Sequence, residues 1–182
     1  MQEISSQTIK EASEGSMSAF RQIYDKTSGF VYNVALRILN NKEDAQEVTQ
    51  DVFVNIFKSL NKYQFESSLK TWIYRITVNT SLNCVRKRKK EVNKHISYDV
   101  TLEKNPGLSI SAPGAKRLEN EELVTRLLDM LNPDQRACVV LRNIEGLSYE
   151  EIALALATNI NTVRSRLKRA REILLNRKNE VN

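Results

Sequence analysis

The chain has 182 residues, of which 28 are lysine or arginine and 22 are aspartate or glutamate, giving a formal net charge of +6. Hydrophobic residues make up 41% and charged residues 27%, which excludes a wholly disordered chain. Five glycines and three prolines are too few turn formers for a sandwich or barrel of many short strands. One histidine, His95, and two cysteines, Cys84 and Cys138, cannot build a Cys/His zinc site or a disulfide framework unaided. We therefore predict no metal and no other cofactor.

The sequence also carries signals of location. It has no apolar run near the 18 or so residues of a membrane span, and its start lacks the basic-then-apolar pattern of a signal peptide. We expect no membrane span and a cytoplasmic, reducing location. The net positive charge favours a polyanionic partner if the basic residues are gathered on one surface.

Two blocks rich in helical periodicity flank a middle segment of different composition. Residues 95–116 hold two of the three prolines and two of the five glycines and show no sustained period, which is typical of a linker. We predict an all-α fold of two small helical domains, residues 1–92 and 117–182, joined by a flexible linker at 93–116.

In the first domain the apolar spacing predicts three helices. One stripe runs from Phe20 to Ile38, and a third segment runs from Leu69 to about Lys89. Between them Asn41 is an expected N-cap, followed by a helix whose apolar positions recur at helical spacing: Ala45, Val48, Val52, Ile56 and Leu60.

Helix boundaries are sharper in the second domain. Asn132 with Gln135, and Ser148 with Glu151, have the spacing of capping boxes, and Gly146 suits the end of the first of these two helices. A tight turn at 158–160 then leads to a final helix that we expect Asn161 to cap. Two helices joined by so short a turn predict a helix-turn-helix.

The final helix is amphipathic and strongly basic. Val163, Leu167 and Leu174 share its apolar face, while residues 161–178 contain seven basic residues and one acidic residue. Arginine and lysine on such a helix can donate to guanine edges and to phosphates in a major groove. The alternative is a solvated basic face, but the turn and the caps favour DNA binding.

The third helix of the first domain carries an unusual polar stripe on a largely apolar surface, namely Trp72, Arg75, Asn79, Asn83 and Arg86. Asparagine amides need hydrogen-bond partners, which nucleobase edges can supply. Tyr63 and Phe65 lie in the preceding loop, where aromatic rings could stack on unpaired bases, and the basic run 86–90 follows. The alternative is that Trp72 packs in the core and the asparagines bond within the domain.

The second helix has a different outer face, formed by Glu47, Gln50, Asp51 and Val54. An acidic, partly apolar face is a poor DNA surface and a reasonable protein-docking surface. A solvated face explains it equally well from the residues alone.

Three stretches together resemble the extracytoplasmic-function group of bacterial RNA polymerase sigma factors. They are DAQEVTQDVFVNIF, LKTWIYRITVNTSLNCVRKRKK and LNPDQRACVVLRNIEGLSYEEIALALATNINTVRSRLKRAREIL, and with the linker they cover about residues 20–178. The resemblance implies a non-catalytic subunit that binds core RNA polymerase and promoter DNA. It also implies an anti-sigma factor as a further partner.

The resemblance assigns a role to each surface. It implies that core polymerase binds Asp44, Glu47, Gln50, Asp51 and Val54. For −10 DNA it implies Tyr63, Phe65, Trp72, Tyr74, Arg75, Asn79, Asn83, Arg86, Lys87 and Arg88, with Asn79 at a pocket for a flipped base. For −35 DNA it implies Thr158, Asn161, Thr162, Arg164, Ser165, Lys168, Arg169 and Arg171.

Two other classes of protein are alternatives to this resemblance. An autonomous helix-turn-helix regulator would bind duplex sites as a symmetric dimer and would leave the stripe at Trp72 unexplained. A nucleic-acid-processing enzyme would need a metal cluster or an activated nucleophile, and the sequence shows no motif for either. We therefore predict no enzymatic activity.

Overall fold

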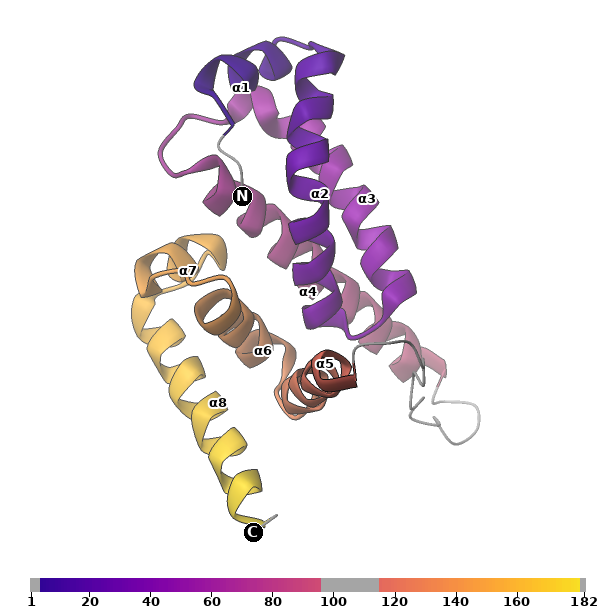
Figure 1. Cartoon of the computed structure of the whole chain (residues 1–182), viewed down its shortest axis with the longest axis vertical. Helices are drawn as coiled ribbons and strands as arrows, with labels where there is room; N and C mark the ends of the chain where they lie inside the picture. The colour runs from indigo at the N-terminus through magenta and orange to yellow at the C-terminus, as the bar shows by residue number, and fades with distance from the viewer. Residues whose placement is uncertain (1–3, 96–114, 181–182) are drawn as a thin grey trace.

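The computed structural model describes residues 4–95 and 115–180, and every regular element in those ranges is a helix (Figure 1). The predicted all-α fold is thus confirmed. The elements are α1 (Ser6–Ser13), α2 (Met17–Leu39), α3 (Lys42–Ser59), η1 (Leu60–Lys62), α4 (Leu69–His95), α5 (Ala115–Asp129), α6 (Pro133–Val139), η2 (Val140–Ile144), α7 (Tyr149–Ala155) and α8 (Ile160–Glu180). Most of the predicted linker, 93–116, lies outside the described residues. None of the described helices has an apolar stretch that could cross a membrane.

The first domain is a bundle of α2, α3 and α4, with α1 packed against the start of α2 (Figure 1). Asn41 caps α3 as predicted, because its side-chain oxygen accepts a hydrogen bond from the backbone of Asp44 at 2.9 Å. The sequence did not predict α1, which is only eight residues long and buries just Ile9 and Ala12. So short a helix leaves too few apolar repeats to reveal a period.

Both predicted capping boxes of the second domain are confirmed. The Asn132 side chain accepts from the Gln135 backbone amide at 2.9 Å, and the Ser148 side chain accepts from the Glu151 backbone amide at 3.1 Å. In each box the side chain of the later residue accepts in turn from the backbone amide of the capping residue. Gly146 connects the two helices with φ of +76°, a backbone angle that glycine adopts without steric cost.

Two local details differ from expectation. The cap of α8 is Asn159 and not Asn161, because the Asn159 side chain accepts from the Asn161 amide at 2.7 Å and its carbonyl accepts from Val163. The helix therefore begins at Ile160, two residues early. In addition, α6 ends in a π-helical turn, η2, which brings Glu145 round toward the first domain.

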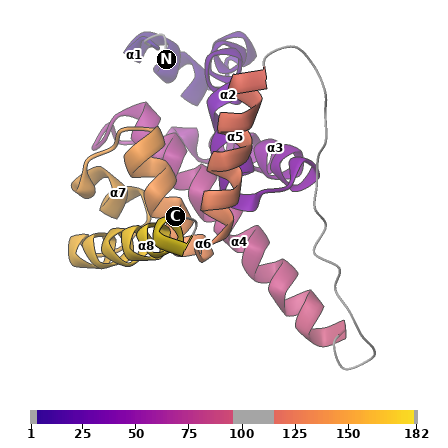
Figure 2. The same ribbon diagram turned by 60° about the horizontal axis from the view of Figure 1, so that its bottom comes forward.

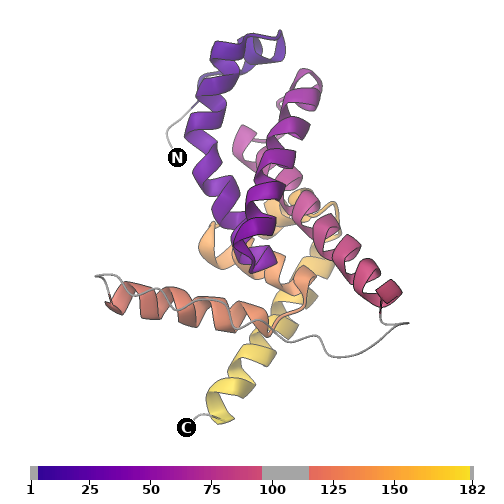
Figure 3. The ribbon, with the colours of Figure 1, turned by 90° about the vertical axis from the view of Figure 1, so that its right-hand side faces the viewer.

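The two domains share one apolar core. Tyr74, Val78 and Leu82 of α4, with Val34 and Ile38 of α2, belong to the same buried cluster as the interior of the helix-turn-helix domain. The second-domain members of this cluster include Leu128, Leu131, Cys138, Leu141, Leu147, Ile152, Val163 and Leu167. α7 lies against α4 in the three-dimensional arrangement, whereas α5 and the far end of α8 project from the body (Figures 1, 2 and 3).

Polar groups close the rim of this shared core. The Tyr74 hydroxyl donates to Glu145 Oε2 at 2.5 Å, and Arg37 Nη1 lies 3.5 Å from Glu145 Oε1. Arg136 Nη1 donates to the Ile38 carbonyl at 3.0 Å, and Arg136 also pairs with Asp129 at 3.2 Å. Tyr74 and the Ile38 carbonyl of the first domain are thus hydrogen-bonded to groups of the second, which fixes how the domains meet.

The Tyr74–Glu145 bond gives the first prediction. Tyr74→Phe should lower the free energy of unfolding by roughly 1.5–3 kcal/mol, the range for hydrogen bonds to charged groups, because it leaves a half-buried carboxylate short of a donor. Urea unfolding of the full chain measures this. Tyr149→Phe is the matched control, since Tyr149 makes its contact to Arg142 through the ring and not the hydroxyl.

The pH dependence offers a second readout of the same bond. Burial and the nearby Glu145 carboxylate both raise the pKa of Tyr74 by disfavouring the phenolate. A raised folded-state pKa contributes stability that is complete below the unfolded pKa, about 10, and is lost as pH rises. The difference between wild type and Tyr74→Phe should therefore shrink above about pH 10. Equal unfolding midpoints for Tyr74→Phe and Tyr149→Phe would contradict the assignment.

Candidate nucleic-acid and protein interfaces

The basic face of α8 is open to solvent. Val163, Leu167 and Ala170 are buried against the rest of the domain, as their spacing predicts. On the outer side the predicted DNA-contacting residues Asn161, Arg164, Ser165, Lys168, Arg169 and Arg171 are exposed, and Thr158 and Thr162 are half-buried. The sequence pattern and the packing therefore agree on which face of α8 is available.

Hydrogen bonds within the first turns of α8 hold some of these side chains in place. Arg164 Nη1 donates to the Asn161 side chain at 3.2 Å, and the Ser165 hydroxyl donates to the Thr162 carbonyl at 2.9 Å. Lys168 has a 78% exposed side chain and is only loosely paired with Glu172, at 3.9 Å. Arg166 differs from its neighbours, because it is half-buried and pairs with Asp134 of α6 at 3.0 Å. It therefore secures α8 to the domain and is not part of the open face.

The polar stripe on α4 lines a groove of about 360 Å³. Trp72, Arg75, Asn79 and Asn83 come from α4 as predicted, and Arg86 lies just beyond and donates to Asn83 at 3.1 Å. The opposite wall was missed by sequence reasoning and comes from the end of α3 and from η1: Asn55, Ser59 and Lys62. Lys87 is exposed on the same helix. The groove thus combines amides, cations and one indole.

Asn79 stands out within this groove. Its side chain is half-buried, yet its amide has no hydrogen-bond partner among the residues that the structure describes. An amide held at a groove wall with all its donors and acceptors open can recognise the edge of a planar polar ligand.

An aromatic row lies at one end of the groove. The Tyr63 ring centroid is 5.3 Å from that of Trp72 and 4.7 Å from that of Phe65. The Tyr63 hydroxyl donates to the Ser67 carbonyl at 2.6 Å, which closes the loop onto itself, and burial raises the pKa of Tyr63. Phe65 is 55% exposed and has φ of +57°, a left-handed conformation that costs a residue with a side chain roughly 1–2 kcal/mol.

Two predicted DNA contacts are engaged elsewhere. Tyr74 is fully buried between the domains and bonded to Glu145, so it does not line the groove and is covered in this arrangement. Its place on the helix next to the polar stripe was misleading, because α4 has two apolar flanks and Tyr74 lies on the one that the second domain covers. Arg88 is exposed and forms an ion pair with Asp44 of α3, two residues that the sequence assigned to different surfaces.

The outer face of α3 is acidic and partly apolar, as expected. Glu47, Gln50, Asp51 and Val54 are exposed, whereas Asp44 is half-buried beneath Arg88. Sequence reasoning missed Phe57 on this face. Phe57 and Val54 are each 49% exposed, and the Phe57 ring packs edge-on against Phe20. Its position three residues after Val54 could have revealed it. The face thus pairs carboxylates with exposed apolar surface.

The remaining reactive side chains do not gather into a site. Within the described ranges no group of three or more His, Cys, Asp or Glu residues could hold a metal ion. Cys138 is buried in the shared core, and this burial raises the pKa of its thiol to about 11. Burial also raises the pKa of Cys84, so neither thiol is activated as a nucleophile.

Comparisons with known proteins find matches over both domains. Residues 23–91 match the family model for Sigma-70 region 2, and residues 121–174 match that for Sigma-70, region 4. The chain is 33% identical over 165 residues to the ECF RNA polymerase sigma factor SigE of Mycolicibacterium smegmatis, a match that spans 88% of this chain and 62% of that protein. It is 31% identical over 182 residues to the RNA polymerase sigma-H factor of Pseudomonas aeruginosa, spanning 95% and 93%.

Two solved structures have a similar fold. The sigma factor RpoE of Bartonella quintana, solved with the anti-sigma factor NepR, is 26% identical with a TM-score of 0.65, over 85% of this chain and 93% of that one. CnrH, solved with the cytosolic domain of CnrY, is 23% identical with a TM-score of 0.69, over 96% and 97%.

The backbone of Phe65 gives the prediction for this region. Phe65→Ala loses the ring but keeps a side chain at positive φ, whereas Phe65→Gly loses the ring and removes the steric cost. We therefore expect Phe65→Gly to be the more stable variant by roughly 1 kcal/mol in urea unfolding. A Phe65→Ala variant as stable as Phe65→Gly would show that the loop does not hold this conformation in solution.

Proposed function

Because the chain belongs to the extracytoplasmic-function group of RNA polymerase sigma factors, we propose that three of its surfaces divide the work of promoter recognition. α3 binds core polymerase, α8 binds duplex DNA at the −35 element, and the α4 groove captures unpaired DNA at the −10 element. Catalysis stays with the polymerase, in the cytoplasm, and this chain is not itself an enzyme. The observation that carries the proposal is the half-buried Asn79 amide, which has no hydrogen-bond partner in the described part of the chain and lies in a groove that also contains arginine, lysine and tryptophan.

The α8 surface suits duplex DNA. The open side of this helix carries Arg164, Lys168, Arg169 and Arg171 and fits a major groove, where phosphate contacts fix position and base-edge contacts give sequence preference. Arg164 and Lys168 lie in the first half of the helix. In a helix-turn-helix that part of the recognition helix meets the bases.

The α4 groove suits single-stranded DNA. Separating base pairs costs free energy, and a protein offsets that cost by giving each freed base a stacking surface or a pocket. Trp72 supplies a ring, Asn79 supplies an amide for a base edge, and Arg75 and Lys62 can neutralise phosphates on either side. The groove thus offers both kinds of contact that an unpaired strand requires.

The α3 surface suits a protein partner. Asp51 and Glu47 repel DNA, while Val54 and Phe57 expose apolar area beside them, a mixture found at protein interfaces. An anti-sigma factor is a further proposed partner, since the RpoE relative was solved with one.

The docking surface gives a charge-reversal prediction. Asp51→Arg should weaken binding to core polymerase by about tenfold or more, because it places like charge where the partner is expected to be basic, and should leave folding intact, because Asp51 is exposed. Glu14→Arg changes the charge equally at an exposed position just after α1 and should bind normally. Equal affinity of both variants for immobilised core polymerase would remove this assignment.

The duplex surface gives a prediction about base preference. Arg164→Ala and Lys168→Ala should each cost about 1–3 kcal/mol at particular −35 bases and relax the preference there. Arg166→Ala should weaken transcription by loosening α8 and leave the preference unchanged, because Arg166 pairs with Asp134. In vitro transcription on a library of −35 variants measures the preference. If all three variants lose activity uniformly across the library, α8 does not read bases through these residues.

The groove gives a prediction about melting. Asn79→Ala should still form holoenzyme and bind closed promoter DNA but lose open complex, because the freed base loses its pocket. Permanganate reactivity of −10 thymines measures opening, and Asn33→Ala, at an exposed position on α2, is the control. On a template with a pre-melted −10 region the Asn79→Ala defect should shrink only in part. Normal thymine reactivity in Asn79→Ala would make this asparagine structural.

A further inference from the structure

One ion pair joins the surface proposed for polymerase to the surface proposed for −10 DNA. Asp44 lies in the first turn of α3, on the polymerase side, and Arg88 lies toward the end of α4, on the DNA side. Their side chains pair with each other. Neither the family comparison nor the roles proposed above give this pair a function. Each residue holds the group that the ligand of the other would have to bind.

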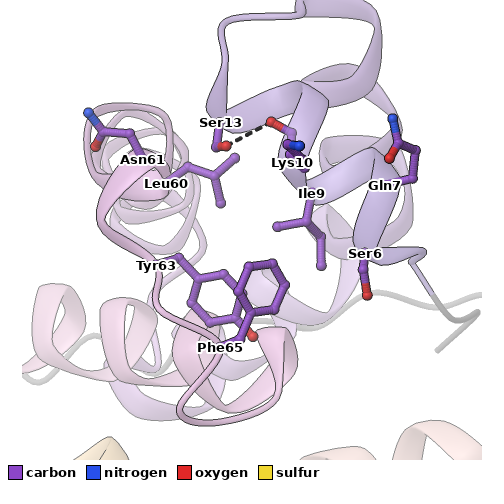
Figure 4. Close-up of a pocket in the computed structure, with 9 residues that line it drawn as sticks. All are labelled: Ser6, Gln7, Ile9, Lys10, Ser13, Leu60, Asn61, Tyr63 and Phe65. Carbon is purple, nitrogen blue, oxygen red and sulfur yellow. Dashed lines mark hydrogen bonds between the residues drawn. The ribbon is translucent and has the colours of Figure 1, made fainter.

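Arg88 differs in this respect from the other cations of the −10 surface. Arg75, Arg86 and Lys87 have no carboxylate partner in the part of the chain that the structure describes. The α4 groove has no acidic residue in its lining. The same is true of the hollow of about 250 Å³ that α1 forms with η1 and the loop after it, at the other end of this surface (Figure 4). A carboxylate therefore meets the −10 surface at Arg88.

The two partners of the pair differ in exposure. The Asp44 side chain is 18% exposed, whereas the Arg88 side chain is 57% exposed and lies over it. Asp44 is also held in place through its backbone, whose amide donates to the Asn41 cap at 2.9 Å. A basic group of a docking protein therefore reaches this carboxylate by displacing Arg88. The long arginine side chain is the partner that can move, because it extends from an exposed position.

Four charges gather where the start of α3 meets α4. Burial raises the pKa of Cys84, which lies one turn before Arg88. The carboxylates of Asp44 and Glu47 raise this pKa further, and the cations of Arg88 and Lys87 lower it. Two acids assigned to polymerase and two cations assigned to DNA thus lie around one thiol. A ligand that neutralises the acids changes the electrostatic field at the cations.

We propose that the Asp44–Arg88 pair couples polymerase docking to capture of the −10 strand. This coupling rests on the proposed functions of α3 and α4 and adds a link between them. In the free chain a DNA phosphate competes with Asp44 for Arg88. When polymerase binds Asp44, Arg88 is released and can neutralise the phosphate. Since coupling between two binding events is reciprocal, bound DNA also favours docking. A partly exposed ion pair limits the effect to about two- to fivefold in affinity.

The loss of DNA affinity on removing Arg88 measures the coupling. Library transcription with core polymerase first supplies a −10 sequence, and a fluorescein-labelled single-stranded oligonucleotide of that sequence is the probe. Its affinity is measured at one low salt concentration, for the full chain alone and for the chain saturated with core polymerase. Arg88→Gln should weaken binding about two- to fivefold more in the complex than in the free chain, because Arg88 is released in the complex. Lys87→Gln removes the same charge one residue away and should weaken binding by the same factor in both.

Substitution of the acid is the second arm. Asp44→Asn frees Arg88 in both states, so in this background Arg88→Gln should weaken binding equally with and without saturating polymerase. Glu43→Gln removes the same charge at an exposed position of the same turn and should keep the wild-type difference. Loss of the pair should lower the melting temperature by no more than about 2–4 °C, so both Arg88→Gln and Asp44→Asn stay folded.

The outcomes separate the coupling from the proposed function. A chain that starts transcription from no promoter in the library fails the proposed function, and the coupling fails with it. A chain that transcribes, but loses the same affinity on Arg88→Gln with and without polymerase, overturns the coupling alone. A Lys87→Gln variant with the same difference as Arg88→Gln also overturns it, since polymerase then changes DNA binding without this ion pair. The comparison of Arg88→Gln with Lys87→Gln decides even if Asp44→Asn does not fold.

Discussion

The packing of α4 against the helix-turn-helix domain is the contact on which the rest of the structure depends. Tyr74, Val78 and Leu82 leave the first domain with an apolar flank that it cannot cover by itself, and the second domain buries it. Burial of this kind is favourable at about 25 cal/mol for each Å² of apolar surface. It has no directional preference, so the polar rim around Glu145 and Arg136 is what selects one orientation of the domains.

This contact explains why α4 has no single apolar face. Ile73 is buried in the core of the first domain, Tyr74 is buried toward the second, and Asn79 lines the groove, so the helix has two buried flanks and one open one. Burial of two flanks positions the groove rigidly, because the residues of α4 cannot shift without disturbing two cores. The groove is therefore preorganised for its proposed ligand, and the free energy of binding is not spent on ordering α4.

Local features could be predicted from the sequence and distant ones could not. Capping boxes span three residues, so the residue types report them directly, and the basic face of α8 follows from spacing within one helix. The cap of α8 was misplaced because Asn159 and Asn161 are equally good capping residues and backbone geometry decides between them. The groove could be predicted only on its α4 side, since Asn55 and Lys62 join it through the tertiary fold. The positive φ of Phe65 could not be predicted, because a positive φ is expected at glycine and this position is a phenylalanine.

The π-helical turn at 140–144 has a consequence for how this chain can vary. Such a turn holds one residue more than a regular helical turn, and successive residues differ by about 100° around a helix axis. A deletion of one residue here would restore regular winding and swing Glu145 away from Tyr74, even if every remaining side chain were unchanged. Relatives that keep this domain contact are therefore constrained in the length of this segment as well as in its residues. A one-residue gap here in an alignment would mark relatives that lack the contact.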